Sequence, residues 1–282
     1  MLTANEIRQA VQQALNEDVG PGDATTLATV PPTAVARAVM VARQPLVLVG
    51  LAFAEAAWRE LSPALRVRRL LRDGAQVRAG QAVLRVQGPA RPILTGERVA
   101  LNFVQRLSGV ATLTAQFVGA IKGTRAHLLD TRKTTPGWRR FEKYAVVCGG
   151  GNNLRAGLYD MILIKDNHLA ALADTKPNPI AAAVARARAA YPKLKVEVEA
   201  DRLDQVVQAV AAGADIILLD NMTPAQLRRA VALVAGRAKT EASGGINLRN
   251  IHTVAATGVD FISVGALTHS APAVDLGLDF EL

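Results

Sequence analysis

Residues 196–220 read VEVEADRLDQVVQAVAAGADIILLD and contain one complete strand–helix–strand unit. The apolar runs at 196–200 and 215–220 predict strands, and the helical spacing of apolar residues over 203–212 predicts the helix between them. The same alternation continues on both sides of this unit. It predicts six strands, at 126–130, 161–165, 196–200, 215–220, 239–243 and 260–265, with helices at 179–190, 203–212, 224–235 and 248–256.

Strands that alternate with helices in this way are typical of parallel α/β folds. The number of strands is close to that of the eight-stranded barrel. The predicted fold is therefore an incomplete α/β barrel of six strands, or of seven if the apolar run AVVCG at 145–149 is another strand. An open doubly wound sheet is the alternative.

The first part of the chain has a different pattern. Thr3 and Glu6 have capping-box spacing ahead of a helical pattern over 3–17, a turn-rich loop follows, and short β-prone runs with further turns come later. A long helical pattern covers 97–122. We therefore predict an N-terminal α/β sandwich domain over 1–112 and a barrel domain over 113–266. We also expect residues 267–282 to pack back on the first domain.

Composition narrows the class of protein. Half of the 282 residues are apolar, enough for a sizeable core, and no apolar run approaches the eighteen or so residues of a membrane span. The N-terminus lacks the pattern of a secretory signal, and a lone cysteine, Cys148, forms neither a disulfide framework nor a Cys-built zinc site. We expect a cytoplasmic protein that does not span a membrane.

The net charge of +9 predicts an anionic partner, which leaves phosphates, carboxylates, nucleic acid and membrane surfaces as candidates. A nucleic-acid-binding protein usually combines a basic face with aromatic side chains. Here aromatics make up 4% of the chain, and some Lys and Arg residues lie at predicted strand ends, among them Arg132, Lys133 and Lys165. A small-molecule site is therefore favoured, with a basic nucleic-acid-binding protein as the alternative.

Polar side chains follow almost every predicted strand of the second domain. In α/β folds the chemistry lies beyond the carboxyl ends of the strands, so these residues are expected to meet in one pocket. They are Asp130, Thr131, Arg132 and Lys133, then Lys165, Asp166, Asn167 and His168, then Glu197 and Glu199, Asp220, Glu241 and Ser243, and Gly265.

Glu197 and Glu199 lie two residues apart on one strand, so both are expected to face the barrel interior. Two buried carboxylates require charged partners or a metal ion. Lys195, Lys133 and Lys165 are candidate partners, and a divalent cation held together with Asp220 is another. Mg²⁺ suits carboxylates plus substrate oxygens, whereas four scattered histidines offer no zinc set. A buried ion-pair network without chemistry is the alternative.

Two glycine-containing segments predict phosphate binding, because each places backbone N–H groups near the expected start of a helix. They are Ser243-Gly244-Gly245, before a helix expected near Asn247, and Val264-Gly265-Ala266. A third stretch, CGGGNNLR at 148–155, lacks the spacing of dinucleotide or ATP motifs. Arg139 and Arg140 just before it are interpreted as an ordinary solvated helix face.

Longer motifs carry a resemblance to a known family. They are EDVGPGDATT (17–26), ERVALNFVQRLSGVAT (97–112), DTRKTTPG (130–137), GGGNNLRAGLYDMILIKDNH (149–168), VEVEA (196–200), ILLDN (217–221), EASGGI (241–246) and DFISVGALTHS (260–270). In this order they resemble the quinolinate phosphoribosyltransferases, also called nicotinate-nucleotide pyrophosphorylases (carboxylating), through almost the whole chain. The resemblance implies an N-terminal α/β domain, an incomplete α/β barrel and a homodimer.

The resemblance also implies an activity, that of a pentosyltransferase of NAD biosynthesis. Quinolinate and 5-phosphoribosyl-1-pyrophosphate, with Mg²⁺, would give nicotinate mononucleotide, pyrophosphate and CO₂. A related phosphoribosyltransferase with another acceptor, of the molybdenum-associated type, is the alternative. No nucleic acid and no membrane take part in such a reaction.

Site residues follow from the resemblance position by position. Thr131, Arg132, Lys133, Arg155 and Lys165 match residues that bind the substrates, and Arg98 matches an arginine supplied across the dimer. Glu199 and Asp220 match carboxylates near the ribose and the metal, and with Lys133 and Lys165 they form the expected catalytic set. The phosphate loops match at Ser243, Gly244, Gly245, Val264, Gly265 and Ala266. One departure is Leu154, where the family usually has His.

Overall fold

The computed structural model describes residues 2–281, which form two compact units. The first unit contains the residues up to Ala115, those from Arg140 to Gly150, and those from Ser270 onward. The second contains Gln116–Arg139 and Gly151–His269. None of the helices within 2–281 is both long enough and apolar enough to cross a membrane.

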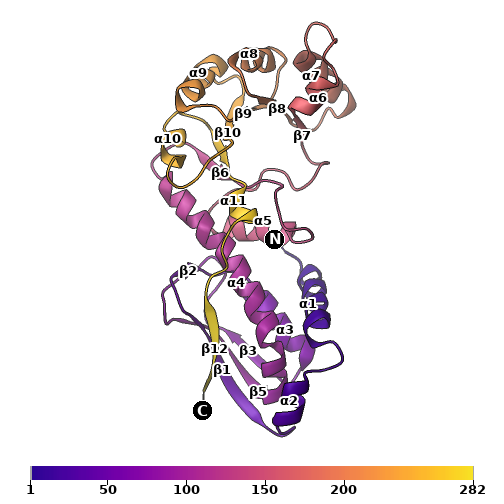
Figure 1. The fold of residues 1–282 in the computed structure, drawn as a ribbon, viewed down its shortest axis with the longest axis vertical. Coiled ribbons are helices and arrows are strands. Elements are labelled where there is room, and N and C mark those ends of the chain that lie inside the picture. The colour runs from indigo at the N-terminus through magenta and orange to yellow at the C-terminus, as the bar shows by residue number, and fades with distance from the viewer. Residues whose placement is uncertain (1, 282) are drawn as a thin grey trace. The chain divides into compact units, whose positions relative to one another are not determined.

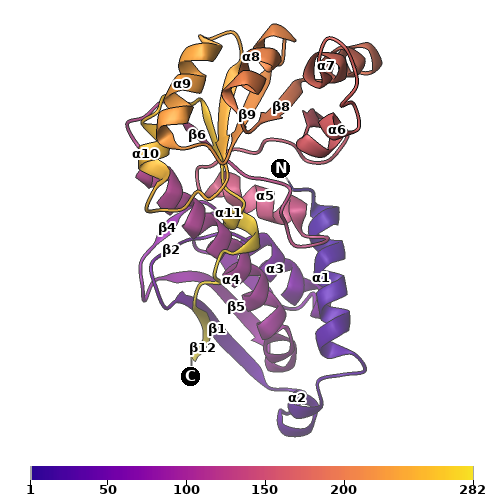
Figure 2. The same ribbon diagram turned by 45° about the horizontal axis from the view of Figure 1, so that its top comes forward.

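The first unit is built on a four-stranded antiparallel sheet with the order β12-β1-β5-β3. Its strands are β1 (Val35–Ala42), β3 (Arg66–Arg69), β5 (Ala82–Pro89) and β12 (Leu276–Glu281), and a separate pair joins β2 (Leu46–Val47) to β4 (Gln76–Val77). The helices are α1 (Ala4–Val19), α2 (Ala24–Thr29), α3 (Leu51–Leu61), α5 (Arg139–Cys148) and α4 (Ala90–Ala120), which continues into the second unit. Figures 1 and 2 show α3 and α4 beside this sheet.

The predicted caps and turns of this unit are present. Thr3 and Glu6 form the capping box that begins α1, and Gly50 precedes α3 in the left-handed conformation that favours glycine. Between α3 and α4, Phe53 stacks on Phe103 with ring centroids 4.7 Å apart, and the Trp58 indole donates to the Ile93 carbonyl at 3.1 Å. These contacts lie in the buried core of the unit.

The second unit contains a six-stranded parallel sheet with the order β6-β11-β10-β9-β8-β7. Its strands are β6 (His127–Leu129), β7 (Ile162–Ile164), β8 (Val196–Ala200), β9 (Ile216–Asp220), β10 (Lys239–Ser243) and β11 (Phe261–Ser263). Its helices are α6 (Asp166–Ala170), α7 (Pro179–Ala190), α8 (Leu203–Ala211), α9 (Pro224–Val234), α10 (Ile251–Ala255) and α11 (Ala266–His269). Figure 2 shows α7, α8 and α9 on one side of the sheet.

The strand order identifies an incomplete barrel. Strands β7 to β11 follow one another in sequence, and β6 pairs with β11 as it would in a closed ring, while β6 and β7 remain unpaired with each other. A doubly wound sheet would reverse its strand order at one point, and this sheet does not. The predicted incomplete α/β barrel is confirmed with six strands. The seventh strand is wrong, because residues 145–148 of AVVCG lie in α5.

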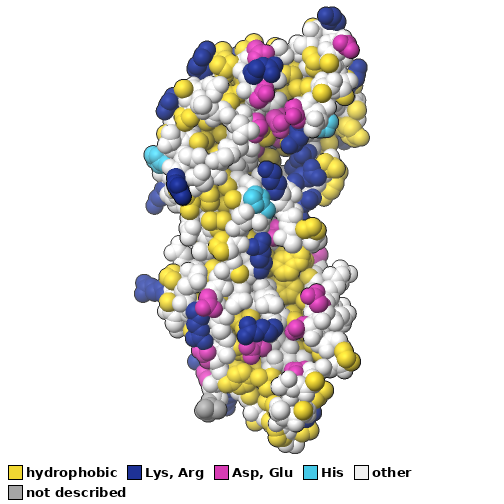
Figure 3. All heavy atoms as spheres, in the orientation of Figure 1, with side chains coloured by type: hydrophobic (Ala, Val, Ile, Leu, Met, Phe, Trp, Pro, Cys, Tyr) yellow, Lys and Arg dark blue, Asp and Glu magenta, His cyan; other side chains and the backbone are white. Residues whose placement is uncertain are grey.

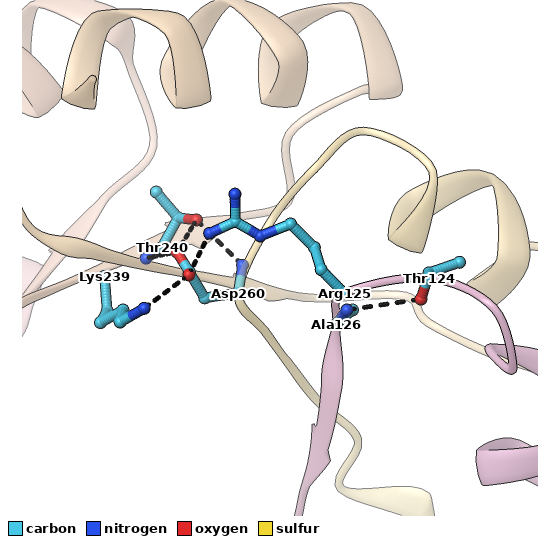
Figure 4. Close-up of polar contacts among 6 residues, drawn as sticks. All are labelled: Thr124, Arg125, Ala126, Lys239, Thr240 and Asp260. Atoms are coloured by element: carbon cyan, nitrogen blue, oxygen red, sulfur yellow. Dashed lines mark hydrogen bonds and ion pairs between the residues drawn. The ribbon is translucent and has the colours of Figure 1, made fainter. Parts of the chain in front are cut away.

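The amino ends of the strands carry a separate polar cluster around Asp260 (Figure 4). Its carboxylate accepts hydrogen bonds from Lys239 Nζ at 2.9 Å and from the backbone N and Oγ1 of Thr240 at 3.0 and 2.9 Å. Arg125 donates to the same carboxylate. The cluster joins the starts of β6, β10 and β11. We interpret it as structural, because this end of the sheet serves stability in barrels.

Candidate functional site

A cavity of about 630 Å³ lies at the carboxyl ends of the six strands. In the space-filling view, acidic and basic side chains gather together on this hollowed face of the second unit (Figure 3). Of the predicted site residues, those lining the cavity are Thr131, Arg132, Lys133, Arg155, Lys165, Glu199, Asp220, Ser243, Gly244, Gly245, Val264, Gly265 and Ala266. The parallel strands therefore bring together residues that are as much as 135 positions apart, such as Thr131 and Ala266.

Three hydrogen bonds hold the loop after β6, which carries the cations Arg132 and Lys133. The Thr131 hydroxyl accepts from the backbone N of Lys133 at 3.1 Å, and Thr268 Oγ1 donates to the Lys133 carbonyl at 2.6 Å. The backbone N of Leu154 donates to the buried Asp130 carboxylate at 3.2 Å. These bonds fix the backbone from which Lys133 and Leu154 reach the cavity.

Lys165 and Glu199 form an ion pair at the cavity wall. Lys165 follows β7, Glu199 lies near the end of the neighbouring strand β8, and Nζ is 3.5 Å from Oε2. Burial raises the pKa of Glu199, the lysine opposes that shift, and Asp220 adds to it. The expectation of a lysine partner is thus met for Glu199.

For Glu197 the expected lysine partners are wrong, because its neighbour is another carboxyl, that of Glu241. Both side chains are buried to 1% exposure or less and line the cavity. Burial first, and then the Glu241 charge, raises the pKa of Glu197 to about 9, and burial also raises the pKa of Glu241. These surroundings favour the neutral, protonated form of the Glu197 carboxyl at neutral pH. Lys195 is exposed and precedes β8, at the other end of the strand.

Unsatisfied polar atoms are concentrated in this cavity. Within residues 2–281, the buried side-chain atoms without a hydrogen-bond partner are Arg132 Nε, both carboxyl oxygens of Glu197 and Glu241 Oε2. Buried polar atoms are rarely left unpaired unless they serve a ligand or a reaction. Arg132 Nε is therefore a donor available to a bound anion.

Glu199 and Asp220 are the candidate metal ligands. They lie at the ends of adjacent strands, and the charge of Asp220 contributes to the raised pKa of Glu199. No group of three or more His, Cys, Asp or Glu side chains within the described range is arranged to hold an ion alone. Two carboxylates fit Mg²⁺ that brings phosphate oxygens of a substrate as its other ligands.

The two glycine loops differ in their surroundings. A Cβ atom at Gly244 would lie 2.1 Å from Asn221 Oδ1, so only glycine permits this approach. A Cβ at Gly265 would lie 3.0 Å from Lys133 Cδ. Helix α11 begins directly after Gly265, as expected, but the helix predicted near Asn247 begins only at Ile251, because residues 247–250 form a turn.

The glycine-rich stretch at 149–151 has a structural role. A Cβ atom at Gly149 would lie 2.4 Å from the Ala111 carbonyl, so this glycine permits the close approach of α5 to α4. Asn152 then forms a single parallel bridge to Leu129 of β6. The residues that follow lead into the cavity at Leu154 and Arg155.

Arg98 does not line the cavity of its own chain. It lies on α4 with its side chain 69% exposed, and its ion pair with Glu97 is 3.8 Å long. Three polar lining residues, Asn221, Ser263 and His269, were missed as site residues. Asn221 donates from Nδ2 to Asp220 Oδ2 at 2.6 Å. It directly follows the predicted strand at 215–220, and this position could have identified it as a site residue.

Comparisons with known proteins agree with this architecture. Residues 23–108 match the family model "Quinolinate phosphoribosyl transferase, N-terminal domain", and residues 110–279 match the corresponding C-terminal domain. The nicotinate-nucleotide pyrophosphorylase [carboxylating] of Mycobacterium leprae is 45% identical over 278 residues, which cover 96% of each chain. A probable nicotinate-nucleotide pyrophosphorylase [carboxylating] of Bacillus subtilis is 39% identical, with 98% of this chain and 94% of that protein covered.

Solved structures show the same likeness in three dimensions. The nicotinate-nucleotide pyrophosphorylase of Francisella tularensis superimposes with a TM-score of 0.93 and 39% identity, covering 100% of this chain and 98% of that one. The Ehrlichia chaffeensis protein of the same name gives a TM-score of 0.91 and 35% identity, covering 97% and 98% of the two chains.

Proposed function

The chain belongs to the quinolinate phosphoribosyl transferase family, and we propose that its barrel cavity transfers phosphoribosyl from 5-phosphoribosyl-1-pyrophosphate to quinolinate. The products are nicotinate mononucleotide, pyrophosphate and CO₂, as de novo NAD biosynthesis requires. The observation that carries the proposal is the cavity itself, where four Lys and Arg side chains meet the Glu199–Asp220 pair and two glycine loops.

The charges of the cavity suit two anionic substrates. Quinolinate is a dianion, and guanidinium groups suit bidentate binding of carboxylates. Arg132, Arg155 and Lys165 would hold the quinolinate carboxylates, and Arg132 Nε offers an unpaired donor for this purpose. The loops at 243–245 and 264–266 would bind the 5′-phosphate.

The first step is displacement at the anomeric carbon of the ribose. The pyridine nitrogen supplies the electron pair of the new C–N bond, the C–O bond to pyrophosphate breaks, and no general base is needed. The transition state has oxocarbenium character, so the carboxylates of Glu199 and Asp220 would order the ribose hydroxyls and stabilise the developing positive charge. Lys133 would neutralise the departing pyrophosphate.

The second step is decarboxylation. The carboxylate beside the quaternised nitrogen leaves as CO₂, and its bonding electrons remain on the ring carbon as a carbanion that then takes up one proton. The positive nitrogen stabilises this carbanion, so the protein needs only to orient the ring and exclude water. Glu199 and Asp220 are the residues that would hold Mg²⁺ with the co-substrate, where the ion would neutralise phosphate charge during the first step.

A homodimer belongs to this proposal. Arg98 is exposed and lies outside the cavity of its own chain, which suits an arginine supplied to the site of a partner subunit. A cytoplasmic location suits quinolinate and 5-phosphoribosyl-1-pyrophosphate, which are both water-soluble.

Incubation of the purified protein with quinolinate, 5-phosphoribosyl-1-pyrophosphate and Mg²⁺ tests the function. We expect nicotinate mononucleotide and CO₂ in equal amounts, and no product when either substrate is omitted. Leu154 lines the cavity where a polar side chain is usual in the family, so nicotinate is assayed in parallel as the acceptor. Turnover of nicotinate without release of CO₂ would favour the related phosphoribosyltransferase, and tight, salt-sensitive binding of nucleic acid without turnover would favour a nucleic-acid-binding protein.

A further inference from the structure

Arg139 does not have the solvated position that its sequence context predicts. It is half-buried at the start of α5, and its guanidinium donates two hydrogen bonds within the second unit. Nε donates to Thr134 Oγ1 and Nη1 donates to the Ala156 carbonyl, both at 3.1 Å. Arg139 itself does not line the cavity.

The two acceptors belong to the two loops that carry the cavity arginines. Thr134 follows Arg132 by two residues, and its backbone N donates to the Arg132 carbonyl at 3.0 Å. Ala156 directly follows Arg155, and its backbone N is held by Asp160 Oδ2 at 2.7 Å. Each end of the bridge is therefore joined through a short, hydrogen-bonded segment to one cavity arginine.

The two cavity arginines carry like charges, which disfavour their close approach. Burial lowers the pKa of Arg155 and the positive charge of Arg132 lowers it further, while nearby carboxylates, those of Glu197, Asp160 and Glu241, oppose this shift. Before a substrate dianion binds, this repulsion opposes the arrangement that the dianion requires. The planar guanidinium of Arg139 can hold two acceptors at a fixed separation, which the point charge of a lysine cannot do.

We propose that Arg139 is a positioning residue that holds Arg132 and Arg155 at the spacing required to bind the quinolinate dianion. This inference rests on the proposed function, since it names quinolinate as the dianion. Lys133 lies on the same loop as Arg132, but its carbonyl is held separately by Thr268 at 2.6 Å. The 5′-phosphate loops have no hydrogen bond to Arg139 among the bonds of the described residues. Arg139 should therefore affect quinolinate binding and leave 5-phosphoribosyl-1-pyrophosphate binding nearly unchanged.

The test compares Arg139→Ala and Arg139→Lys with Arg140→Ala as a matched control. Arg140 is the next residue, is exposed, and pairs with Glu6 at 2.8 Å in the first unit. We expect Arg139→Ala to raise the KM for quinolinate about tenfold, as loss of a charge-assisted bond implies, with the KM for 5-phosphoribosyl-1-pyrophosphate changed less than about twofold. Arg139→Lys should restore little of the loss, and Arg140→Ala should leave both constants unchanged.

Thr134→Val provides a second variant that removes one end of the bridge with little change in side-chain volume. We expect a rise of about threefold in the quinolinate KM, and calorimetric titration of each variant with quinolinate should give the same order. Equal behaviour of the Arg139 and Arg140 variants would overturn the inference. An equal rise of both KM values would also overturn it. A fall in kcat alone would overturn it too, because that is the effect of a smaller amount of folded protein. A wild-type protein that neither binds nor converts quinolinate would instead overturn the proposed function, and the inference with it.

Discussion

Lys165 Nζ lies 3.5 Å from Glu199 Oε2, across the carboxyl ends of two neighbouring strands. The lysine side chain is 49% exposed and that of the glutamate 16%, so the pair lies at the mouth of the cavity rather than in the core. A half-exposed pair at this separation contributes little to folding. We expect it to serve the proposed reaction instead, by placing one cation and one carboxylate at the cavity wall.

Replacement of this lysine should therefore separate activity from stability. We expect Lys165→Ala to change the free energy of unfolding by less than about 1 kcal/mol, because exposed pairs contribute no more than that. The same variant should lower kcat/KM at least tenfold, because it removes a preorganised cation. Urea denaturation and initial rates measure the two effects. A loss of several kcal/mol of stability would show that the pair serves the fold instead.

Arg132 has a buried Nε in the cavity without a hydrogen-bond partner. We therefore expect replacement of Arg132 to change the rate of the reaction more than the stability of the protein. Removal of a cationic side chain that contacts the substrate should cost about 2 to 4 kcal/mol of transition-state stabilisation. We expect Arg132→Ala to lower kcat/KM at least tenfold, with thermal stability nearly unchanged. Normal steady-state kinetics in this variant would contradict the role given to Arg132.

Arg98 should be required in trans. We expect Arg98→Ala and Lys165→Ala homodimers to be inactive, and a mixture of the two to recover part of the activity after subunit exchange. Recovery follows because a mixed dimer contains one site in which both residues are intact. The exchange itself is verified by native mass spectrometry of differently labelled chains. Absence of recovery in verified mixed dimers would argue against a shared site.

Leu154 presents an apolar side chain to a cavity whose other wall residues are mostly charged or polar. Replacement by His would add a hydrogen-bond donor near a bound carboxylate, and such bonds to charged groups contribute about 1.5 to 3 kcal/mol. We expect Leu154→His to lower the KM for quinolinate about tenfold, measured at saturating 5-phosphoribosyl-1-pyrophosphate. The backbone N of residue 154 would keep its bond to Asp130. An increased KM would mean that the chain has adapted this wall to an apolar contact.

Asp260 should control acid stability rather than activity. Its hydrogen bonds to Thr240, Lys239 and Arg125 outweigh burial and lower its pKa from 3.8 to about 2 (Figure 4). A depressed folded-state pKa stabilises the protein above pH 3.8, and this contribution disappears as the pH falls towards 2. With allowance for the exposed partners, it is worth about 1 to 2 kcal/mol at neutral pH.

We therefore expect Asp260→Asn to lower the free energy of unfolding by about this amount at pH 7, with a smaller difference from wild type at pH 3. Denaturant titrations at the two pH values measure the effect. Because the cluster lies at the amino ends of the strands, kcat/KM at pH 7 should be unchanged. A stability difference that grows towards acid pH would contradict the assignment.

Much of the barrel was predictable because its signals are local. The pattern of VEVEA and DIILLD places strands at Val196–Ala200 and Ile216–Asp220, and the residues that close such strands must share one edge of a parallel sheet. The gathering of Arg132, Lys165 and Asp220 in one cavity follows from that rule alone. Their individual roles in binding and catalysis stay predictions.

Other features depended on contacts that no local pattern reports. The run AVVC is short and apolar, and such a run suits a strand or a buried helix equally, so the helical state of α5 was decided by packing. Glu197 faces Glu241 from a strand two places away in the sheet, and the sequence supplied lysines as equally plausible partners.

The sequence by itself determined the order of strands and helices and the chemistry available at the strand ends, because side-chain periodicity and strand polarity are properties of neighbouring residues. Only the tertiary structure decided that the ring stays open between β6 and β7, that the buried Glu197 carboxyl lies near that of Glu241, and that Arg139 joins two loops. Each of these depends on distances between residues remote in the chain. Such distances are set by how the whole barrel packs, which no short stretch of residues encodes.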